Sequence, residues 1–210
     1  MTSQRSKPTG LVDDDTDPVT RAPNSIPKEQ ILDAAYELLL AVGMRRLSMA
    51  DIARSARVSR ATLYRNWPNV NSVVGALVTR EFAGMTAHAF ATDTVPARAR
   101  LVSGVVAMVR LVRVHPLMRK IIDVDPEFLL PYLVERRGTS TTHQLGQLEM
   151  ALQAGRADGS IRAGKTALQA RAMWLLALSF TLSAPVLADE VSLEDLDGQL
   201  AELLDRYLAP

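Results

Sequence analysis

Residues Ser48–Trp67 read SMADIARSARVSRATLYRNW, and the interpretation of the whole chain starts from this stretch. Ser48 is followed three residues later by Asp51, the spacing of a capping box, which predicts the start of a helix. Arg57–Ser59 then forms a turn, after which the hydroxyl of Ser59 can cap a second helix, Arg60–Trp67. Two short helices joined by a turn of about three residues are typical of a helix-turn-helix.

The second of these helices has an apolar face and a polar face. Leu63 and Trp67 are four residues apart, so we expect both to pack inward from one face. The other side chains fit a DNA major groove, where the N-terminal residues of such a helix reach base edges and its flanks meet phosphates. The DNA contacts expected from the whole stretch are Ser48, Arg60, Thr62, Tyr64, Arg65 and Asn66. Arg60 and Thr62 are assigned to base edges, Arg65 to a base or a phosphate, and the other three to phosphates.

Basic residues are concentrated around this stretch, although the chain of 210 residues has a net charge of only +1. From Arg45 to Arg65 there are six arginines and a single acid, Asp51. Such a cluster is the electrostatic signature of a protein that binds a phosphate backbone. The sequence therefore predicts double-stranded DNA as a partner.

The same region carries a series of motifs in a set order after a first helix. They are Gly43, Leu47-Ser48, Asp51-Ile52-Ala53, Val58-Ser59, Thr62-Leu63-Tyr64 and the aromatic Trp67. The series resembles the DNA-binding domain of TetR/AcrR-type repressors over about residues 31–77, and the rest of the chain is similar only in length and helical pattern. The resemblance implies a transcriptional regulator that is not an enzyme.

Two positions depart from the usual pattern of that family. Arg57 stands in the turn where the family usually has glycine, and an arginine adopts φ > 0 only at a cost. Val70 stands where the family usually has a lysine that grips the DNA backbone. We expect Asn69 to cap the next helix and to direct its N-terminus at a phosphate instead.

The composition favours helices along the whole chain. It is 48% hydrophobic and only 5% aromatic, and its apolar residues recur at helical spacing. We predict an all-α fold, with breaks near Pro131 or Gly138 and near Pro185. The helices expected after residue 70 cover about residues 71–90, 97–114, 115–122, 126–154 and 166–187 and a last segment capped by Ser192.

The sequence divides into three parts. Residues 1–24 are rich in Ser, Thr, Pro and Asp and predict a disordered leader. Residues 25–70 predict a three-helix DNA-binding domain, in which Ser25 caps the first helix and Gly43 ends it. Residues 71–210 predict a helical domain, to which the resemblance assigns effector binding and dimerisation.

Large, adaptable side chains in the third part are candidates for an effector pocket. They are Met85, Met108, Met118, Phe128, Tyr132 and Trp174. Methionines fill irregular gaps and can line a forgiving pocket, but each of these residues taken singly also fits an ordinary core. The resemblance favours the pocket, and the implied effector is a small apolar or amphipathic molecule.

The last two predicted helices carry apolar stripes that we expect to form a homodimer interface. The residues assigned to it are Leu178, Leu182, Leu196, Leu200, Leu203 and Tyr207. In the family that the chain resembles, the terminal helices pair across a twofold axis as a four-helix bundle. Dimerisation also has a physical purpose, because two heads spaced by a turn of DNA can read a palindrome.

A competing motif lies at Gly159–Thr166, which reads GSIRAGKT and matches the P-loop pattern for nucleotide phosphates. A P-loop follows a buried strand, whereas Leu148–Ala154 has the composition of a helix. We interpret the match as chance and keep an α-helical nucleotide-binding protein or enzyme as the alternative function. An architectural or protein-interaction module with a degenerate head is a third hypothesis.

No cofactor, metal site or catalytic set is predicted. The chain has no cysteine, and His88, His115 and His143 are far apart, which argues against a metal site. The longest apolar run, Ala172–Ala188, is interrupted and short for a membrane span of about 20 residues, so no membrane partner is expected. We expect a cytoplasmic, nucleoid-associated repressor that binds a palindromic operator as a homodimer and is released by its effector.

Overall fold

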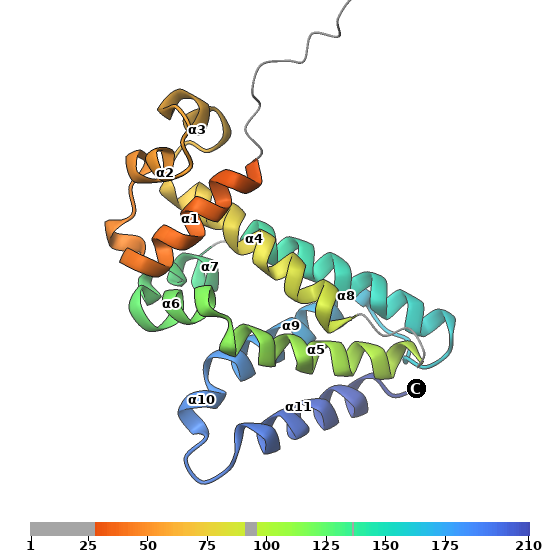
Figure 1. The fold of residues 1–210 in the computed structure, drawn as a ribbon. Helices are drawn as coiled ribbons and strands as arrows, with labels where there is room; N and C mark the ends of the chain where they lie inside the picture. The colour runs from red at the N-terminus through yellow and green to blue at the C-terminus, as the bar shows by residue number, and fades with distance from the viewer. Residues whose placement is uncertain (1–27, 91–95, 136) are drawn as a thin grey trace, which may run out of the picture.

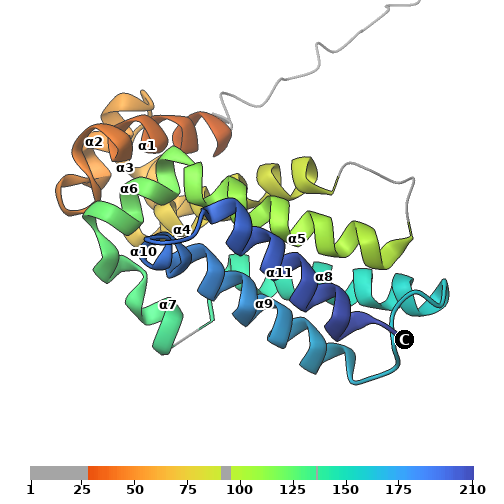
Figure 2. The same ribbon diagram turned by 90° about the horizontal axis from the view of Figure 1, so that it is seen from below.

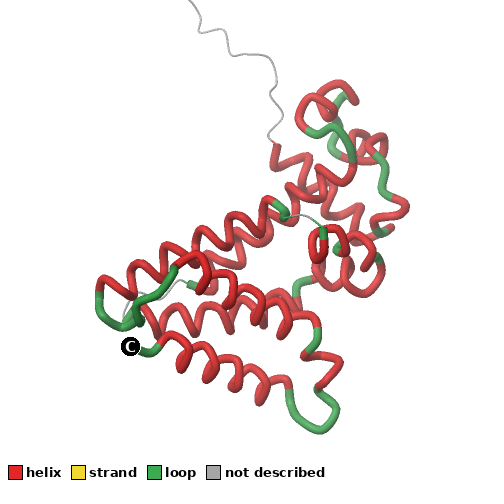
Figure 3. Tube along the Cα trace, turned by 180° about the vertical axis from the view of Figure 1, so that it is seen from behind, coloured by secondary structure: helices red, strands yellow, loops and turns green. Residues whose placement is uncertain are grey.

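The computed structural model describes residues 28–90, 96–135 and 137–210. The expected leader over residues 1–24 and the expected N-cap Ser25 lie outside the described residues. Every regular element in the described ranges is a helix, and none is a strand (Figures 1 and 3). The prediction of an all-α fold is therefore confirmed.

Three helices and a short 3-10 helix form one end of the molecule, which we call the head (Figure 1). They are α1 (Lys28–Val42), η1 (Met44–Arg46), α2 (Met49–Ser55) and α3 (Arg60–Asn66). The first helix ends as predicted at Gly43, whose φ of +78° is a conformation that glycine adopts without strain. The chain then turns back, so that α2 packs against both α1 and α3.

The long helix α4 (Val70–Ala89) leads from the head into the remaining helices, which we call the body. The body elements are α5 (Ala97–Val114), α6 (Pro116–Val124), η2 (Pro126–Phe128), α7 (Leu130–Val134), α8 (Thr139–Ala157), α9 (Thr166–Leu182), α10 (Ala184–Leu187) and α11 (Leu193–Leu208). Figure 2 shows α5, α9 and α11 running alongside one another. Because α5 contacts α4, α8, α9 and α11, it is the central helix of the body.

Prolines account for the breaks in the second half of the chain. The segment 126–154 has the break expected near Pro131 or Gly138: it is divided into η2, α7 and α8, and α8 begins after Gly138 and continues to Ala157. Pro131 lies in the first turn of α7, where the missing N–H is harmless. The helix expected to reach residue 187 ends at Leu182, because the chain restarts as α10 with Pro185 in its first turn.

Buried apolar side chains form two clusters. The head core joins α1, α2, α3 and α4 to α6 and to the end of α5, and Leu63, Leu77 and Ile121 are each at most 1% exposed within it. The body core joins α5, α8, α9 and α11 and includes the fully buried Leu152 and Leu204. The head is therefore supported by α6 as well as by its own helices.

Candidate nucleic-acid interface and body cavity

The hydroxyl of Ser48 caps α2, as the sequence predicts. Its oxygen accepts a hydrogen bond from the backbone N–H of Asp51 at 3.1 Å. The same hydroxyl donates to the Asp51 carboxylate at 2.5 Å. A phosphate contact from Ser48 would therefore compete with Asp51 for the hydroxyl proton.

The apolar face of α3 fixes the orientation of this helix. The hydroxyl of Ser59 accepts a hydrogen bond from the N–H of Thr62 at 3.0 Å, which caps the helix start. Leu63 is fully buried and Trp67, which ends the helix, is 8% exposed. Both residues pack inward as predicted, so the opposite face of α3 is turned to solvent.

The polar residues expected on α3 fall into two groups. Arg60, Tyr64 and Arg65 are exposed. Thr62 and Asn66 are half-buried and bonded within their own helix, because Asn66 Nδ2 donates to the Thr62 carbonyl at 3.0 Å. Thr62 Oγ1 also lies 2.9 Å from the hydroxyl oxygen of the capping serine. The first group is available to a partner, whereas the second must give up internal hydrogen bonds to reach one.

The turn between α2 and α3 is built around Arg57. Its φ is +55°, in the left-handed region where a side chain with a Cβ is strained. The N–H of Val58 donates to the carbonyl of Ala53 at 2.9 Å, which closes the end of α2. The backbone thus has the conformation that glycine favours, and the arginine side chain remains exposed.

A capping box starts α4. The Asn69 side chain accepts a hydrogen bond from the N–H of Ser72 at 2.9 Å, and the hydroxyl of Ser72 accepts one from the N–H of Asn69 at 3.2 Å. The predicted cap is confirmed. Val70 begins the helix and packs against the head core, so it adds an apolar contact where a lysine would add a charge.

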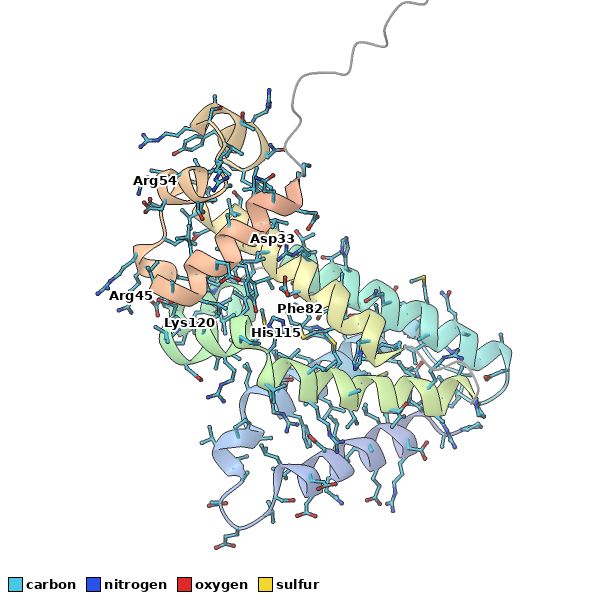
Figure 4. The ribbon with its side chains drawn as sticks, in the orientation of Figure 1. Asp33, Arg45, Arg54, Phe82, His115 and Lys120 are labelled. Atoms are coloured by element: carbon cyan, nitrogen blue, oxygen red, sulfur yellow. The ribbon has the colours of Figure 1, made fainter. Side chains whose placement is uncertain are left out.

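The arginines of the head differ in their partners. Arg45 lies 2.8 Å from Glu127, and this hydrogen bond lowers the pKa of Glu127 below its usual value. Arg54 lies 3.3 Å from Asp51 (Figure 4). Among the described residues, no ion pair involves Arg57, Arg60 or Arg65. Arg57 lies in the turn before α3 and Arg60 and Arg65 lie on α3, and no acid of the described chain neutralises them.

The body contains a cavity of about 850 Å³, walled by α4 to α9 and η2. Five residues predicted for a pocket line it: Met108, Met118, Phe128, Tyr132 and Trp174. Such a volume is within the range of cavities that hold drug-sized ligands. The side chains named from the sequence are thus brought together around one space.

Met85 does not line the cavity, so that part of the sequence prediction is wrong. It is 7% exposed and packs in the head core. Helical geometry explains this, because Met85 lies about three turns after Val74 on the same side of α4, whereas Phe82 and Thr86 project toward the cavity.

The cavity wall is mainly apolar, and its described residues include no charged side chain. The hydroxyls of Thr79, Thr86 and Thr181 donate at 2.7–2.8 Å to carbonyls four residues earlier in their own helices. Trp174 Nε1 donates to Gln144 Oε1 at 2.7 Å and joins α9 to α8. These threonine hydroxyls and the indole N–H are therefore already bonded within the protein.

Several wall residues were not identified from the sequence. Phe82 and Thr86 share a face of α4 with Gly75 and Thr79, at the helical spacing that marks a common face. This spacing is a signal that could have found them. Gln144 has no such signal, because one glutamine on an exposed-looking helix matches no motif.

Comparison with known proteins identifies the family. The sequence model described as "Bacterial regulatory proteins, tetR family" matches residues 31–77. Over 183 residues the chain is 30% identical to Rv2250c, an uncharacterized HTH-type transcriptional regulator of Mycobacterium tuberculosis, and the match covers 85% of this chain and 93% of the relative. This chain belongs to the TetR family. It is therefore a DNA-binding transcriptional regulator and not an enzyme, and α2 and α3 form its helix-turn-helix.

Solved structures extend the likeness to the body of this TetR-family chain. The TetR-family transcriptional repressor QsdR of R. erythropolis is 19% identical, with a TM-score of 0.66 over 87% of this chain and 96% of that one. FadR of Bacillus subtilis, solved in complex with stearoyl-CoA, is 16% identical, with a TM-score of 0.60 over 87% of this chain and 100% of that one. These structures share the fold, an N-terminal helix-turn-helix domain followed by a helical domain.

The P-loop-like segment is a loop between two helices in this TetR-family fold. It follows α8 instead of a strand, and Thr166 Oγ1 accepts a hydrogen bond from Arg156 at 2.5 Å. Just before and within this loop, Asp158 and Ser160 accept hydrogen bonds from the first N–H groups of α5, at 2.9 and 3.1 Å. Arg162 donates to the Tyr207 carbonyl at 2.5 Å near the end of α11. The loop thus caps neighbouring helices, and the interpretation of the motif as a chance match agrees with this role.

The residues predicted for the dimer interface do not share one surface of the regulator. Leu200 is fully buried in the body core of its own chain, so its assignment to the interface is wrong. Leu178 and Leu182 line the cavity. Leu203 is 48% exposed, whereas Leu196 and Tyr207 are partly buried. The stripe assumed from sequence spacing therefore spans two faces of α11.

A polar cluster joins α1, α4 and α6 where head and body of the regulator meet (Figure 4). Arg80 lies 2.7 Å from Asp33 and 3.3 Å from Glu29, both on α1. Arg80 also lies 2.8 Å from Glu81, which lies 3.3 Å from His115 just before α6. Movement of α4 relative to either helix would disturb these contacts.

A second connection links η1 to the segment after α6. The Met44 N–H donates to the Asp125 carboxylate at 2.8 Å, and Asp125 is only 1% exposed. The bond is next to Gly43, where an added Cβ would lie 3.2 Å from the same carboxylate. The end of α1 is therefore held closely against the body.

No group of three or more His, Cys, Asp or Glu side chains among the described residues could hold a metal ion. No single helix in the described ranges is both long and apolar enough to cross a membrane. The pair α5 and α6 meets the length and composition criteria only when joined, and it is bent by 63°.

Proposed function

We propose that this regulator is a homodimeric repressor that binds a palindromic operator and is released by a small apolar or amphipathic effector. In this proposal residues 25–70 are the DNA-binding domain and residues 71–210 bind the effector and dimerise. The exposed face of α3 enters the major groove. The effector occupies the body cavity.

The observation that carries the proposal is the double role of α4. Its buried residues Val73, Val74 and Leu77 belong to the head core. Its opposite face, which includes Phe82 and Thr86, walls the cavity. Because one helix supports the head and lines the cavity, a ligand that favours one position of α4 also favours one position of the head.

The assignment of DNA contacts rests on the exposed side chains of α3. Arg60 lies in the first turn of the helix, which is the part that reaches base edges in helix-turn-helix proteins. Arg65 and Tyr64 are exposed beside it and are assigned to a base or phosphate and to a phosphate. Ser48, Thr62 and Asn66 complete the proposed contacts after exchanging internal hydrogen bonds for external ones.

Two similar structures support repression and ligand binding. QsdR of R. erythropolis is described as a transcriptional repressor of the TetR family. FadR of Bacillus subtilis was solved in complex with stearoyl-CoA. A cavity of about 850 Å³ in the corresponding domain of this chain is large enough for an effector of drug size.

Exposed apolar residues of the last helices support a homodimer. They lie along α9, α10 and α11 and include Leu168, Leu175, Val186, Leu187 and Leu203, each between 48% and 79% exposed. Large apolar side chains exposed on helices that contact one another commonly mark an interaction site. This surface replaces Leu200 in the proposed interface.

Selection of bound fragments from random double-stranded DNA tests the proposal. We expect an enriched palindrome whose half-sites are separated by about one helical turn or a multiple of it. Equal retention of all sequences would refute operator recognition and would favour the architectural alternative. Compounds that raise the melting temperature and then release the selected DNA would identify the effector, and a compound that tightens DNA binding would refute release.

A further inference from the structure

Three threonines of the cavity wall, on α4 and α9, offer a ligand little hydrogen-bonding capacity. Each hydroxyl of Thr79, Thr86 and Thr181 donates its proton to a carbonyl of its own helix. A threonine bonded in this way presents its methyl group and acceptor lone pairs, but no donor. These residues therefore behave toward a ligand almost as apolar residues do.

The contact between Trp174 and Gln144 is different, because it fixes the direction of an amide. An indole N–H can only donate, so the oxygen of Gln144 must be the atom that faces Trp174, at 2.7 Å. The NH₂ group of Gln144 is then directed elsewhere, and among the described residues no hydrogen bond to it is seen. Since Gln144 lines the cavity, its NH₂ group can donate a hydrogen bond to an acceptor on a bound ligand.

The absence of charged side chains from the described wall also limits which ligands can bind. None of the described lining residues is acidic or basic. A charged group taken from water into such a site loses its hydration and finds no counter-ion, which is strongly unfavourable. The cavity therefore selects against ammonium and carboxylate groups and favours neutral molecules.

We propose that the effector is an uncharged amphiphile whose polar end is an acceptor oxygen, such as the carbonyl of an ester, ketone or amide, bound by Gln144 Nε2. Its apolar part lies along the wall that includes Phe82, Met108 and Met173. The inference rests on the proposed effector role of the cavity and names the chemical class that fits it.

Four probes with similar hydrocarbon chains differ in their charge and in whether they carry an acceptor oxygen. They are methyl decanoate, decanoate, decylammonium and undecane. Binding is measured by the fluorescence of Trp174 in a Trp67→Phe chain, which retains one of the two tryptophans. Calorimetry on the wild-type chain measures the same dissociation constants without the substitution. We expect methyl decanoate to bind about tenfold or more tightly than either ion, and more tightly than undecane.

Gln144→Glu is the decisive variant. It keeps an oxygen for Trp174 but replaces the NH₂ donor by a second, negatively charged acceptor. The ester should lose about tenfold or more in affinity, while decylammonium should bind more tightly than in the wild type. As a control, Gln153→Glu places the same charge on an exposed position of α8 outside the cavity. It should change neither the affinity for the ester nor that for decylammonium.

Each outcome bears on a different claim. Decanoate bound as tightly as the ester, or an unchanged ester affinity in Gln144→Glu, would overturn the inference about neutral acceptors. Failure of all four probes to bind would refute both this inference and the cavity as an effector site. If the ester binds as expected but leaves operator DNA bound, the ligand class stands and the proposed release mechanism fails.

Discussion

The exposed face of α3 and the wall of the body cavity differ in how they treat polar groups. On α3, Arg60 and Arg65 have no acidic partner among the described residues, and Tyr64 is 52% exposed. In the cavity, the hydroxyls of Thr79, Thr86 and Thr181 are bonded to their own helices, and the described wall carries no charge. The first surface suits a polyanion because its charges are not neutralised, and the second suits a neutral molecule because it offers no charge at all.

The largest expected effect is the loss of stability on removing a buried leucine from the head core or from the body core. Leu63 of the head and Leu152 of the body are both fully buried, and replacing either by alanine should cost about 2–5 kcal/mol of unfolding free energy. Urea denaturation measures this loss. Since Leu63 anchors α3, Leu63→Ala should also weaken operator binding by the folded protein, whereas Leu152→Ala should leave it nearly unchanged. Equal DNA affinity in the two variants would contradict the role of Leu63 in orienting α3.

Replacing Arg60 by alanine tests direct reading of bases by α3. Loss of a base contact should cost about 1–3 kcal/mol of operator binding and relax specificity at one base pair. Titrations against the operator and against single-base variants measure both effects. An equal loss on operator and random DNA would instead assign Arg60 to the phosphate backbone.

Replacing Tyr64 by phenylalanine tests a phosphate contact on the same face. Removing one hydroxyl should weaken binding by about 0.5–1.5 kcal/mol, and by the same amount for all DNA sequences. Parallel titrations with operator and random DNA measure the two losses. A loss confined to the operator would show that Tyr64 reads sequence.

Replacing Arg57 by glycine tests the strained turn. Relief at φ +55° should raise the unfolding free energy by about 0.5–1 kcal/mol. If the side chain also meets a phosphate, the slope of log affinity against log salt should fall by about 0.9. Denaturation and binding at several salt concentrations measure the two effects separately, and a destabilised variant would contradict the strain argument.

The smallest expected effect concerns acid stability of the body. Hydrogen bonds from Ser160 and from the N–H of Ala97 lower the pKa of Asp158 below its usual value. A lowered pKa in the folded state means that the contribution to stability is present above the unfolded pKa and is lost as pH falls through the folded pKa. Asp158→Asn should therefore reduce the fall in melting temperature between about pH 5 and pH 3. An unchanged pH profile would show that this cap does not titrate with unfolding.

Features set by a few neighbouring residues were predictable from the sequence. The caps at Ser48, Ser59, Asn69 and Ser192 and the stop at Gly43 are all found where expected. Each depends on a hydroxyl, an amide or a permissive backbone within a few residues of the helix end. The fold of the head follows largely from such local signals.

Assignments that depend on distant neighbours were less successful. Met85 was assigned to a pocket and Leu200 to an interface, because periodicity marks an apolar face but does not reveal which helix lies opposite it. Each packs into a core of its own chain instead of the expected pocket or interface. Gln144 acquires its significance only from Trp174, a residue thirty positions away in the sequence.

Because α4 is long, a small tilt of this helix displaces its far end by a large distance. Its 20 residues span about 30 Å, so a tilt of about 5° with the body end fixed displaces the other end by about 2–3 Å. The Asn69–Ser72 capping box stiffens that end, where it adjoins Trp67 and α3. A displacement of this size is comparable to a whole hydrogen-bond length. In the proposed release mechanism, a ligand therefore needs to reshape the cavity wall only slightly to move a side chain of α3 away from a base edge.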